Sequence, residues 1–321
     1  MSEPEKIPGT ENIKVKPDFE KKYRALCRDE EYYEEFMKYS LSFLRRSIRI
    51  NTLKADIDSV KKSLKEKGWI LKQIPWSKEG FWVTNETGRR DIGNTKEHAL
   101  GYIYVQEAVS MIPPVVLDPQ PGETVLDMCA SPGSKTSQLA MYMKNEGILL
   151  ANDYQGMRVR PLGLNMQRIG ATNVLITLMD GARYRDIEFD RILVDAPCSG
   201  SGTIRKSLKT LRMWSENSIK RIASQQKTLI SNAFTLLKPG GTMVYSTCSL
   251  EPEENEAMVD FLLKKFPEAD CVPFEMDMKW GEPVMEWNGE KFDERVKNTL
   301  RIWPQDNDTE GFFVAKLTKR K

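Results

Sequence analysis

From Gly101 onward the chain alternates short apolar runs with longer stretches of helical periodicity. The apolar runs have the length and composition of buried strands, and they lie at residues 124–129, 148–153, 174–180, 192–195 and 242–246. Helical stretches at 136–144, 157–169 and 215–237 separate several of them. This alternation predicts an α/β fold built on an open, largely parallel sheet. Residues 311–317 alternate in polarity and predict an edge strand.

The first hundred residues follow a different pattern. Apolar residues from Phe19 to Met37 recur at three- and four-residue steps, which indicates an amphipathic helix or a pair of helices. Strand-like runs follow at 47–51, 69–74 and 81–84, with a short helical stripe between the first two. We therefore expect a compact N-terminal α+β domain over residues 1–100 and a sheet domain over residues 101–321.

The composition excludes several classes of protein. No apolar run approaches the length of a membrane span, and the N-terminal residues lack the apolar stretch of a secretory signal. Five scattered cysteines without a Cys-x-x-Cys pair argue against a disulfide framework and against a metal site. We expect a protein of the reducing cytoplasm. Because His98 is the only histidine, acid or base catalysis falls to a carboxylate, a thiol or water.

Two cysteines follow apolar runs and precede small, turn-forming residues. Cys198 lies in the segment DAPCSGSG, which begins at Asp195, and Cys248 lies fifty residues later in YSTCS. Both thiols are expected at strand ends on one edge of the sheet, where open α/β sheets hold their chemistry. Partial exposure in an electropositive setting makes a thiol a nucleophile. The pair suggests that one cysteine forms a covalent bond and that the other helps to break it. A basic segment without acids, residues 205–212, follows the first motif, where a phosphate backbone would pass.

The first strand of the predicted sheet runs into the segment DMCASPGSKT at 127–136 and then into a helix. A helix that begins after a tight Pro-Gly loop presents backbone N–H groups to an anionic or polar ligand. The spacing does not match a phosphate-binding loop or a dinucleotide fingerprint. Asp153, Asp180 and Asp195 close the next three strands, although any one of them could simply cap a helix or turn. S-adenosylmethionine fits this pattern, with its carboxylate at the loop, its ribose at Asp153 and its adenine at Asp180.

The motifs together resemble the Nop/Sun (RsmB-like) family of RNA 5-methylcytosine methyltransferases, and the archaeal-type tRNA enzymes most of all. The resemblance rests on DMCASPGSKTSQLA at 127–140, ANDYQGMR at 151–158, DAPCSGSGT at 195–203 and YSTCS at 245–249. Weaker agreement extends to SIRINTLK at 47–54, YVQEAVS at 104–110 and the closing GFFVAKL. The resemblance implies a Rossmann-like, seven-stranded methyltransferase sheet that depends on S-adenosylmethionine. It also implies that the N-terminal domain is an RRM-like RNA-binding domain.

The resemblance also implies roles for individual residues. Cys248 is the nucleophile, and Cys198 assists release of the product. Asp195 contacts the N3 side of cytosine, and Lys135 closes the loop and contacts the substrate. The implied cofactor-binding residues are Cys129, Ala130, Ser131, Pro132, Gly133, Ser134, Lys135, Asp153, Arg158, Asp180 and Asp195. The family often has glycine at the position of Ser134, a departure that we expect to shift the loop without emptying it.

Three other functions compete with this interpretation. A DNA cytosine methyltransferase places its attacking thiol directly after proline, as in Pro197-Cys198, but the presence of Cys248 argues against that class. A noncatalytic RNA-binding protein with a methyltransferase fold would not need both cysteines and the cofactor aspartates. Among RNA substrates we favour tRNA over rRNA, because the chain is short and has a small N-terminal domain. We expect the protein to act as a monomer, without a membrane or a metal ion.

Overall fold

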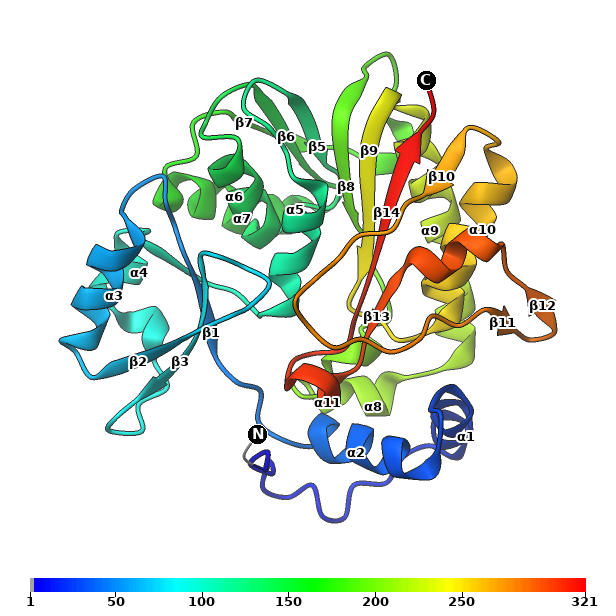
Figure 1. Cartoon of the computed structure of the whole chain (residues 1–321), viewed down its shortest axis with the longest axis horizontal. Helices are drawn as coiled ribbons and strands as arrows, with labels where there is room; N and C mark the ends of the chain where they lie inside the picture. The colour runs from blue at the N-terminus through cyan, green and yellow to red at the C-terminus, as the bar shows by residue number, and fades with distance from the viewer. Residues whose placement is uncertain (1–2) are drawn as a thin grey trace.

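A single large sheet forms the centre of the protein, whose computed structural model describes residues 3–321 (Figure 1). The sheet has eight strands in the order β10-β14-β9-β8-β5-β6-β7, and β13 pairs with β14 beside this path. The strands are β5 (Thr124–Asp127), β6 (Ile148–Asp153), β7 (Val174–Leu178), β8 (Phe189–Asp195), β9 (Leu237–Thr247), β10 (Ala269–Cys271), β13 (Leu300–Ile302) and β14 (Phe312–Lys319). All pairings from β9 to β7 are parallel, which confirms the predicted α/β class.

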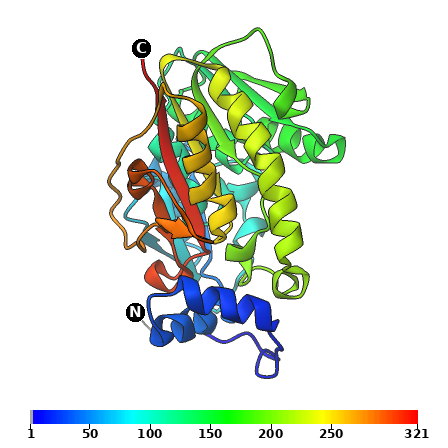
Figure 2. The same cartoon turned by 90° about the vertical axis from the view of Figure 1, so that its right-hand side faces the viewer.

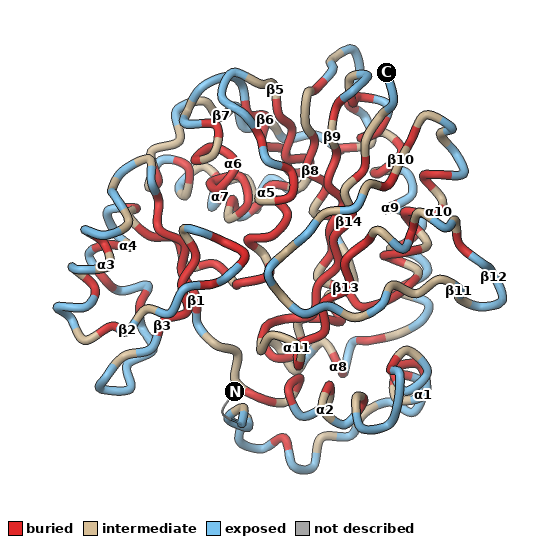
Figure 3. The backbone as a smooth tube through the Cα atoms, in the orientation of Figure 1, coloured by how far each residue is buried: buried red, intermediate tan, exposed pale blue. Residues whose placement is uncertain are grey.

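Helices cover both faces of this sheet. One face carries α5 (Ile112–Leu117), α6 (Ser134–Tyr142) and α7 (Gly156–Ile169), and the other carries α9 (Glu216–Thr235) and α10 (Glu256–Lys265) (Figure 2). Successive residues of β8 alternate between the two cores: Leu193 packs with α5 and α6, whereas Ile192 and Val194 pack with α9. This period of two explains why the central strands are uniformly apolar and buried (Figure 3). Among the described residues, no helix is long and apolar enough to cross a membrane.

The prediction that the last strand lies at the edge of the sheet is wrong. β14 pairs with β9 on one side and with β10 on the other. Residues 312–315 are all buried, because helices cover both faces of the sheet at this point. The true outer strand, β10, has only three residues and gives no periodic signal in the sequence.

A second, four-stranded sheet lies beside the large one and has the order β2-β3-β1-β4. Its elements are β1 (Ser47–Ile50), α3 (Ile57–Lys65), β2 (Trp69–Gln73), β3 (Gly80–Asn85), α4 (Lys96–Ala99) and β4 (Ile103–Val105). Ile48, Leu64 and Phe81 belong to its separate core. Because β4 pairs with β1, this sheet extends past the predicted boundary at residue 100.

The N-terminal helices do not share the core of the small sheet, which differs from the predicted single unit over residues 1–100. The helices α1 (Pro17–Leu26) and α2 (Glu30–Ser40) pack near α8 (Lys209–Met213) and α11 (Pro304–Asn307) (Figure 1). Phe19 meets Trp214 edge to face at 5.5 Å, and Phe36 meets Trp303 at 5.4 Å. The aromatic partners of this helical face lie in the second half of the chain, so the helices pack there.

A buried ion pair holds the chain that follows Cys248. Arg301 in β13 donates two hydrogen bonds to Glu256 at the start of α10, at 2.8 and 2.6 Å, and one to the carbonyl of Leu250 at 2.7 Å. Both charged side chains are almost completely buried. A buried pair of this kind holds its geometry strongly, because either charge alone would lack compensation.

Replacement of Arg301 by methionine should therefore lower the free energy of unfolding by about 3–5 kcal/mol. The exposed pair of Arg89 with Asp91 has the same two-pronged geometry, with bonds of 3.0 and 3.1 Å, and provides the matched control. Arg89→Met should change the free energy of unfolding far less, because water screens exposed pairs. Urea unfolding of the three proteins measures the difference, and equal losses would contradict this account.

Candidate active site

The two cysteine motifs leave the large sheet side by side. β8 and β9 pair in parallel with Asp195 opposite Ser246, and the N–H of Ala196 donates to the carbonyl of Ser246 at 2.9 Å. Both chains then turn out of the sheet at the same edge. The sulfur atoms of Cys198 and Cys248 lie 3.2 Å apart, within hydrogen-bond distance.

An ion pair lies next to the thiols. The Nζ of Lys135 is 2.7 Å from Oδ2 of Asp195, and the hydroxyl of Ser246 donates to Oδ1 of the same carboxylate at 2.8 Å. Burial lowers the pKa of Lys135, but the charge and hydrogen bond of Asp195 outweigh it, so that the pKa is raised overall. Lys135 is thus held as a cation, and both oxygens of Asp195 are fixed in direction.

The two thiols differ in their surroundings. The hydrogen bond with Cys248 and burial raise the pKa of Cys198 well above its usual value, and the charges of Glu254 and Asp195 add to this effect. Cys198 therefore keeps its proton at neutral pH. Cys129, the cysteine of the first loop, also has a pKa well above its usual value, because it is buried among three aspartates.

The loop between β5 and α6 is fixed by a glycine in a left-handed conformation. Gly133 has φ +103°, and a Cβ at this position would lie 2.7 Å from Cε of Met166. Thr136 in the first turn of α6 donates to Asp127 at 2.7 Å, and burial raises the pKa of Asp127 to about 7. The loop therefore approaches α7 closely while the N-terminus of α6 points toward the site.

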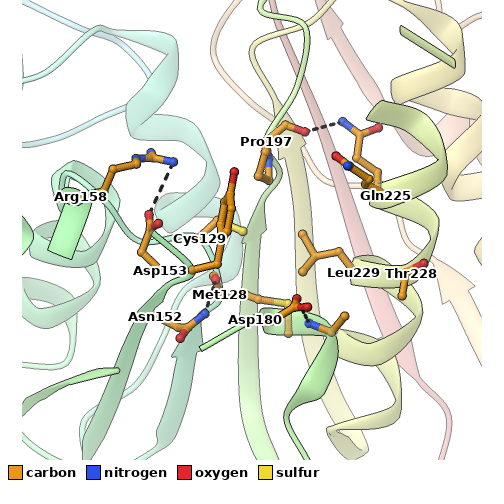
Figure 4. Close-up of a pocket in the computed structure, with 14 residues that line it drawn as sticks. Met128, Cys129, Asn152, Asp153, Arg158, Asp180, Pro197, Gln225, Thr228 and Leu229 are labelled. Atoms are coloured by element: carbon orange, nitrogen blue, oxygen red, sulfur yellow. Dashed lines mark hydrogen bonds and ion pairs between the residues drawn. The ribbon is translucent and has the colours of Figure 1, made fainter. Parts of the chain in front are cut away.

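A cleft of about 370 Å³ opens beside this loop (Figure 4). Asp153 lies in its wall, and Oδ1 accepts from the N–H of Gln155 at 3.0 Å. Oδ2 is buried without a hydrogen-bond partner among the described residues and lies 3.6 Å from Arg158. A buried carboxylate oxygen of this kind requires a donor, and ribose hydroxyls supply one. The cleft, named here the cofactor cleft, is lined by Met128, Cys129, Asn152, Asp153, Tyr154, Arg158, Asp180, Gly181, Ala182, Pro197, Gln225, Gln226, Thr228 and Leu229.

Asp180 lines the cofactor cleft and also caps a short helix. Its carboxylate accepts from the N–H of Ala182 at 3.0 Å at the start of the 3-10 helix η3 (Gly181–Arg183). The side chain remains more than half exposed, whereas that of Asp153 is buried. The two interpretations of Asp180 in the sequence, ligand contact and turn cap, are therefore compatible.

A second cleft, of about 450 Å³, continues from the first and is named here the substrate cleft. Cys129 and Arg158 line both clefts. The predicted residues in its wall are Cys129, Ala130, Ser131, Pro132, Ser134, Lys135, Arg158, Asp195 and Cys248. Gly133 and Cys198 line neither cleft: the former packs against α7, and the latter lies behind Cys248. The structure thus brings the predicted residues into one continuous region.

Several residues of the substrate cleft were missed in the sequence. They are Tyr104, Val105, Gln106, Glu107, Ser110, Asp127, Thr203, Glu310 and Phe312, whereas Lys206, which also lines the cleft, belongs to the basic segment 205–212. Burial and the nearby charge of Glu310 raise the pKa of Glu107 to about 8. Glu107 and Phe312 lie within YVQEAVS and GFFVAKL, so the weaker similarity of those segments was the available signal.

The expectation that the whole basic segment 205–212 faces a phosphate backbone is wrong for Arg205. Its guanidinium is buried and donates to the carbonyls of Phe43 and Thr309 and to Asp308, at 2.7, 3.0 and 2.7 Å. Arg205 therefore ties three chain segments together. Lys206, Lys209 and Arg212 are exposed. Among residues 3–321, no group of three or more His, Cys, Asp and Glu side chains could hold a metal ion.

The doubly covered parallel sheet and the loop at its carboxyl edge define a Rossmann-like methyltransferase that uses S-adenosylmethionine. The family model for the 16S rRNA methyltransferases RsmB/F matches residues 114–318, and the model for the N-terminal domain of RsmF matches residues 15–108. The chain belongs to the RsmB/F methyltransferase family. This confirms the family, the enzyme class and the cofactor inferred from the sequence.

Individual relatives agree with this assignment. The tRNA (cytosine(49)-C(5))-methyltransferase of Pyrococcus abyssi is 49% identical over 89% of this chain and 92% of its own length. Ribosomal RNA small subunit methyltransferase F of Shewanella loihica is 44% identical over 89% of this chain, which spans 59% of that protein. A solved methyltransferase homologue from Pyrococcus horikoshii is 38% identical, with a TM-score of 0.79 over 95% of this chain and all of the other.

Proposed function

We propose that this protein methylates carbon 5 of cytosine in RNA, with tRNA as its substrate, through a covalent bond to Cys248. The observation that carries the proposal is the 3.2 Å contact between Cys198 and Cys248 beside the ion pair of Lys135 and Asp195. Cys248 lines the substrate cleft and Cys198 does not, which supports Cys248 as the attacking thiol.

Carbon 5 of cytosine is too weak a nucleophile to take a methyl group unaided. The thiolate of Cys248 adds to carbon 6, and the electron pair of the C5–C6 double bond moves toward carbon 5 and the N3 side of the ring. Asp195, fixed by Lys135 and Ser246, is oriented to accept a hydrogen bond from the amino group or the protonated N3 on this side of the ring, and the cation of Lys135 offsets the negative charge that develops. When bound, S-adenosylmethionine supplies the methyl group for carbon 5.

Release of the product requires cleavage of the C6–S bond that Cys248 formed. A water molecule takes the proton from carbon 5, and the bonding electrons restore the C5–C6 double bond as the C6–S bond breaks. The electron pair of the C6–S bond returns to the sulfur of Cys248. Cys198 touches this sulfur and holds a proton, so we assign it to the release step.

The cofactor would lie in the cofactor cleft, between Asp153 and the loop from Cys129 to Lys135. Arg158 donates to the carbonyl of Ser131 at 2.7 Å and so links this loop to the side that carries Asp153. Cys129 and Arg158 line both clefts, so the methyl group of the cofactor would meet the base beside these two residues.

To reach the substrate cleft the base must leave its stack, so a loop or a distorted region of the RNA is the expected target. The small N-terminal sheet is the proposed RNA-binding element, with the exposed Lys62 and Lys65 on its helix α3. tRNA is favoured by the similarity to the Pyrococcus abyssi enzyme. rRNA remains the second candidate, because the family model and the Shewanella relative bear the names of rRNA enzymes. We expect a monomer to carry out the reaction.

The purified protein should transfer labelled methyl groups to tRNA, and bisulfite sequencing should place the label on a cytosine. Equal amounts of tRNA and 16S rRNA transcripts, tested separately, provide the comparison. Label in rRNA alone would favour the second candidate, and no label in either would favour a noncatalytic RNA-binding protein.

Cys248→Ala should abolish methylation without forming an adduct, because the C6–S bond cannot form. Cys198→Ala should accumulate protein bound covalently to RNA, because addition proceeds and release fails. A denaturing gel with labelled RNA distinguishes the two variants. The reverse pattern would overturn the assignment of the two thiols.

Asp153→Ala should weaken binding of S-adenosylmethionine by roughly tenfold to a hundredfold, the usual consequence of losing a buried hydrogen bond to a charged group. Asp180→Ala, at an exposed position of the same cleft, should weaken it by less than about tenfold. Isothermal titration calorimetry measures both dissociation constants. A larger effect at Asp180 would contradict the proposed arrangement.

A further inference from the structure

The backbone on both sides of Cys198 is held by two buried side chains from distant elements. Gln226 in α9 donates from Nε2 to the carbonyl of Pro197 at 2.9 Å, the bond drawn at Pro197 in Figure 4. Glu254, at the end of the 3-10 helix η5 (Pro252–Glu254), accepts from the N–H of Ser199 at 2.9 Å. Gln226 also donates to the same oxygen of Glu254 at 3.2 Å, so the two side chains form one unit around Cys198.

Burial of these two polar side chains costs free energy, because they lose their hydrogen bonds to water. Gln226 and Glu254 are 1% and 0% exposed, and each has one side-chain oxygen without a hydrogen-bond partner among the described residues. Burial raises the pKa of Glu254 to about 7. A tyrosine hydroxyl, that of Tyr245, fixes the backbone of Glu254 with a bond of 2.7 Å to its carbonyl. A buried polar network of this kind makes the local structure rigid, here the backbone on both sides of Cys198.

The loop of Cys248 is held by other contacts. The carbonyl of Cys248 accepts from the N–H of Gly202 at 3.0 Å, and the N–H of Leu250 donates to the hydroxyl of Ser201 at 2.9 Å. Neither bond uses the side chains of Gln226 or Glu254. Both bonds join the Cys248 loop to residues 201 and 202, and the hydroxyls of Ser199 and Ser249 lie 3.2 Å apart. These contacts remain when the side chain of Glu254 or Gln226 is replaced, whereas the bonds at Pro197 and Ser199 that flank Cys198 are lost.

We propose that Glu254 and Gln226 are positioning residues that fix the sulfur of Cys198 for the release step. The inference rests on the proposed function, in which the two thiols act in different halves of the reaction. Addition of Cys248 to carbon 6 needs Cys248 and Asp195. Loss of the proton from carbon 5 and cleavage of the C6–S bond need Cys198 in place. A small displacement of a group that acts in a reaction slows that step strongly, so loss of the unit should slow release alone.

The test uses Glu254→Ala and Gln226→Leu in the full chain, with labelled S-adenosylmethionine and a tRNA transcript. In Glu254→Ala, single-turnover methyl transfer should stay within about threefold of the wild type, whereas steady-state turnover should fall by about tenfold or more. Gln226 also lines the cofactor cleft, so Gln226→Leu is judged by adduct accumulation at saturating S-adenosylmethionine. Covalent protein–RNA adduct should accumulate on a denaturing gel. Glu254→Gln retains an oxygen that can accept from Ser199, and it should accumulate less adduct than Glu254→Ala.

Two further proteins make the result decisive. Glu253→Gln changes the neighbouring carboxylate, which contacts Lys22 and Trp287 instead of the Cys198 loop, and it should behave as the wild type. Cys198→Ala is the reference for adduct accumulation. If this variant accumulates no adduct, the proposed function is wrong. If it accumulates adduct while the folded Glu254 and Gln226 variants release product normally, the positioning role is wrong. A parallel loss of methyl transfer and release without adduct would also overturn it. Should Glu254→Ala fail to fold by circular dichroism, the adduct that Gln226→Leu accumulates at saturating S-adenosylmethionine decides.

Discussion

The register between β8 and β9 is the constraint on which the rest of the site depends. Parallel pairing places Asp195 opposite Ser246, so the DAPC and STCS segments leave the sheet together. The hydroxyl of Ser246 bonds Asp195 directly, and the sulfur atoms of Cys198, three residues after Asp195, and Cys248, two residues after Ser246, lie 3.2 Å apart. A shift of one residue would turn every side chain of one strand to the opposite face and separate these groups. The burial of both faces by helices prevents such a shift, because Leu193 and Val194 already fill different cores.

A second constraint is the close contact of three backbones behind the thiols. The N–H of Gly202 donates to the carbonyl of Cys248, and the N–H of Gly311 donates to the carbonyl of Gly202 at 3.0 and 2.8 Å. A Cβ on Gly202 would lie 2.2 Å from the carbonyl oxygen of Gly311, which no ordinary packing allows. Glycine at this position thus lets the start of β14 reach the catalytic edge, and it brings Glu310 and Phe312 into the substrate cleft.

The sequence predicted the parts of the fold and site that depend on local patterns. The run at 148–153 matches β6 residue for residue, and the motifs around Cys129, Asp153 and Cys248 meet at one edge of the sheet. Contacts between distant segments were not predictable. The burial of Arg205 depends on carbonyls at residues 43 and 309, and the interior position of β14 depends on a three-residue neighbour. Neither contact leaves a periodic signal in the sequence, so the local pattern alone predicts an exposed basic segment at 205–212 and an edge strand at 311–317.

The N-terminal helices belong to the support of the active site, even though they come from the other end of the chain. Glu251, three residues after Cys248, is completely buried and accepts from the hydroxyl of Tyr23 and from Nε1 of Trp214, both at 2.8 Å. Lys22 balances its charge at 2.7 Å. A buried carboxylate without these partners would be strongly destabilising, so the Cys248 loop and α1 must order together. The small sheet has its own core, but Trp82 of β3 also packs in the core that contains Ile112 of α5, and Tyr104 of β4 lines the substrate cleft. Both parts of the N-terminal region therefore contact the large sheet domain: α1 and α2 support the Cys248 loop, and the small sheet forms part of the wall of the cleft.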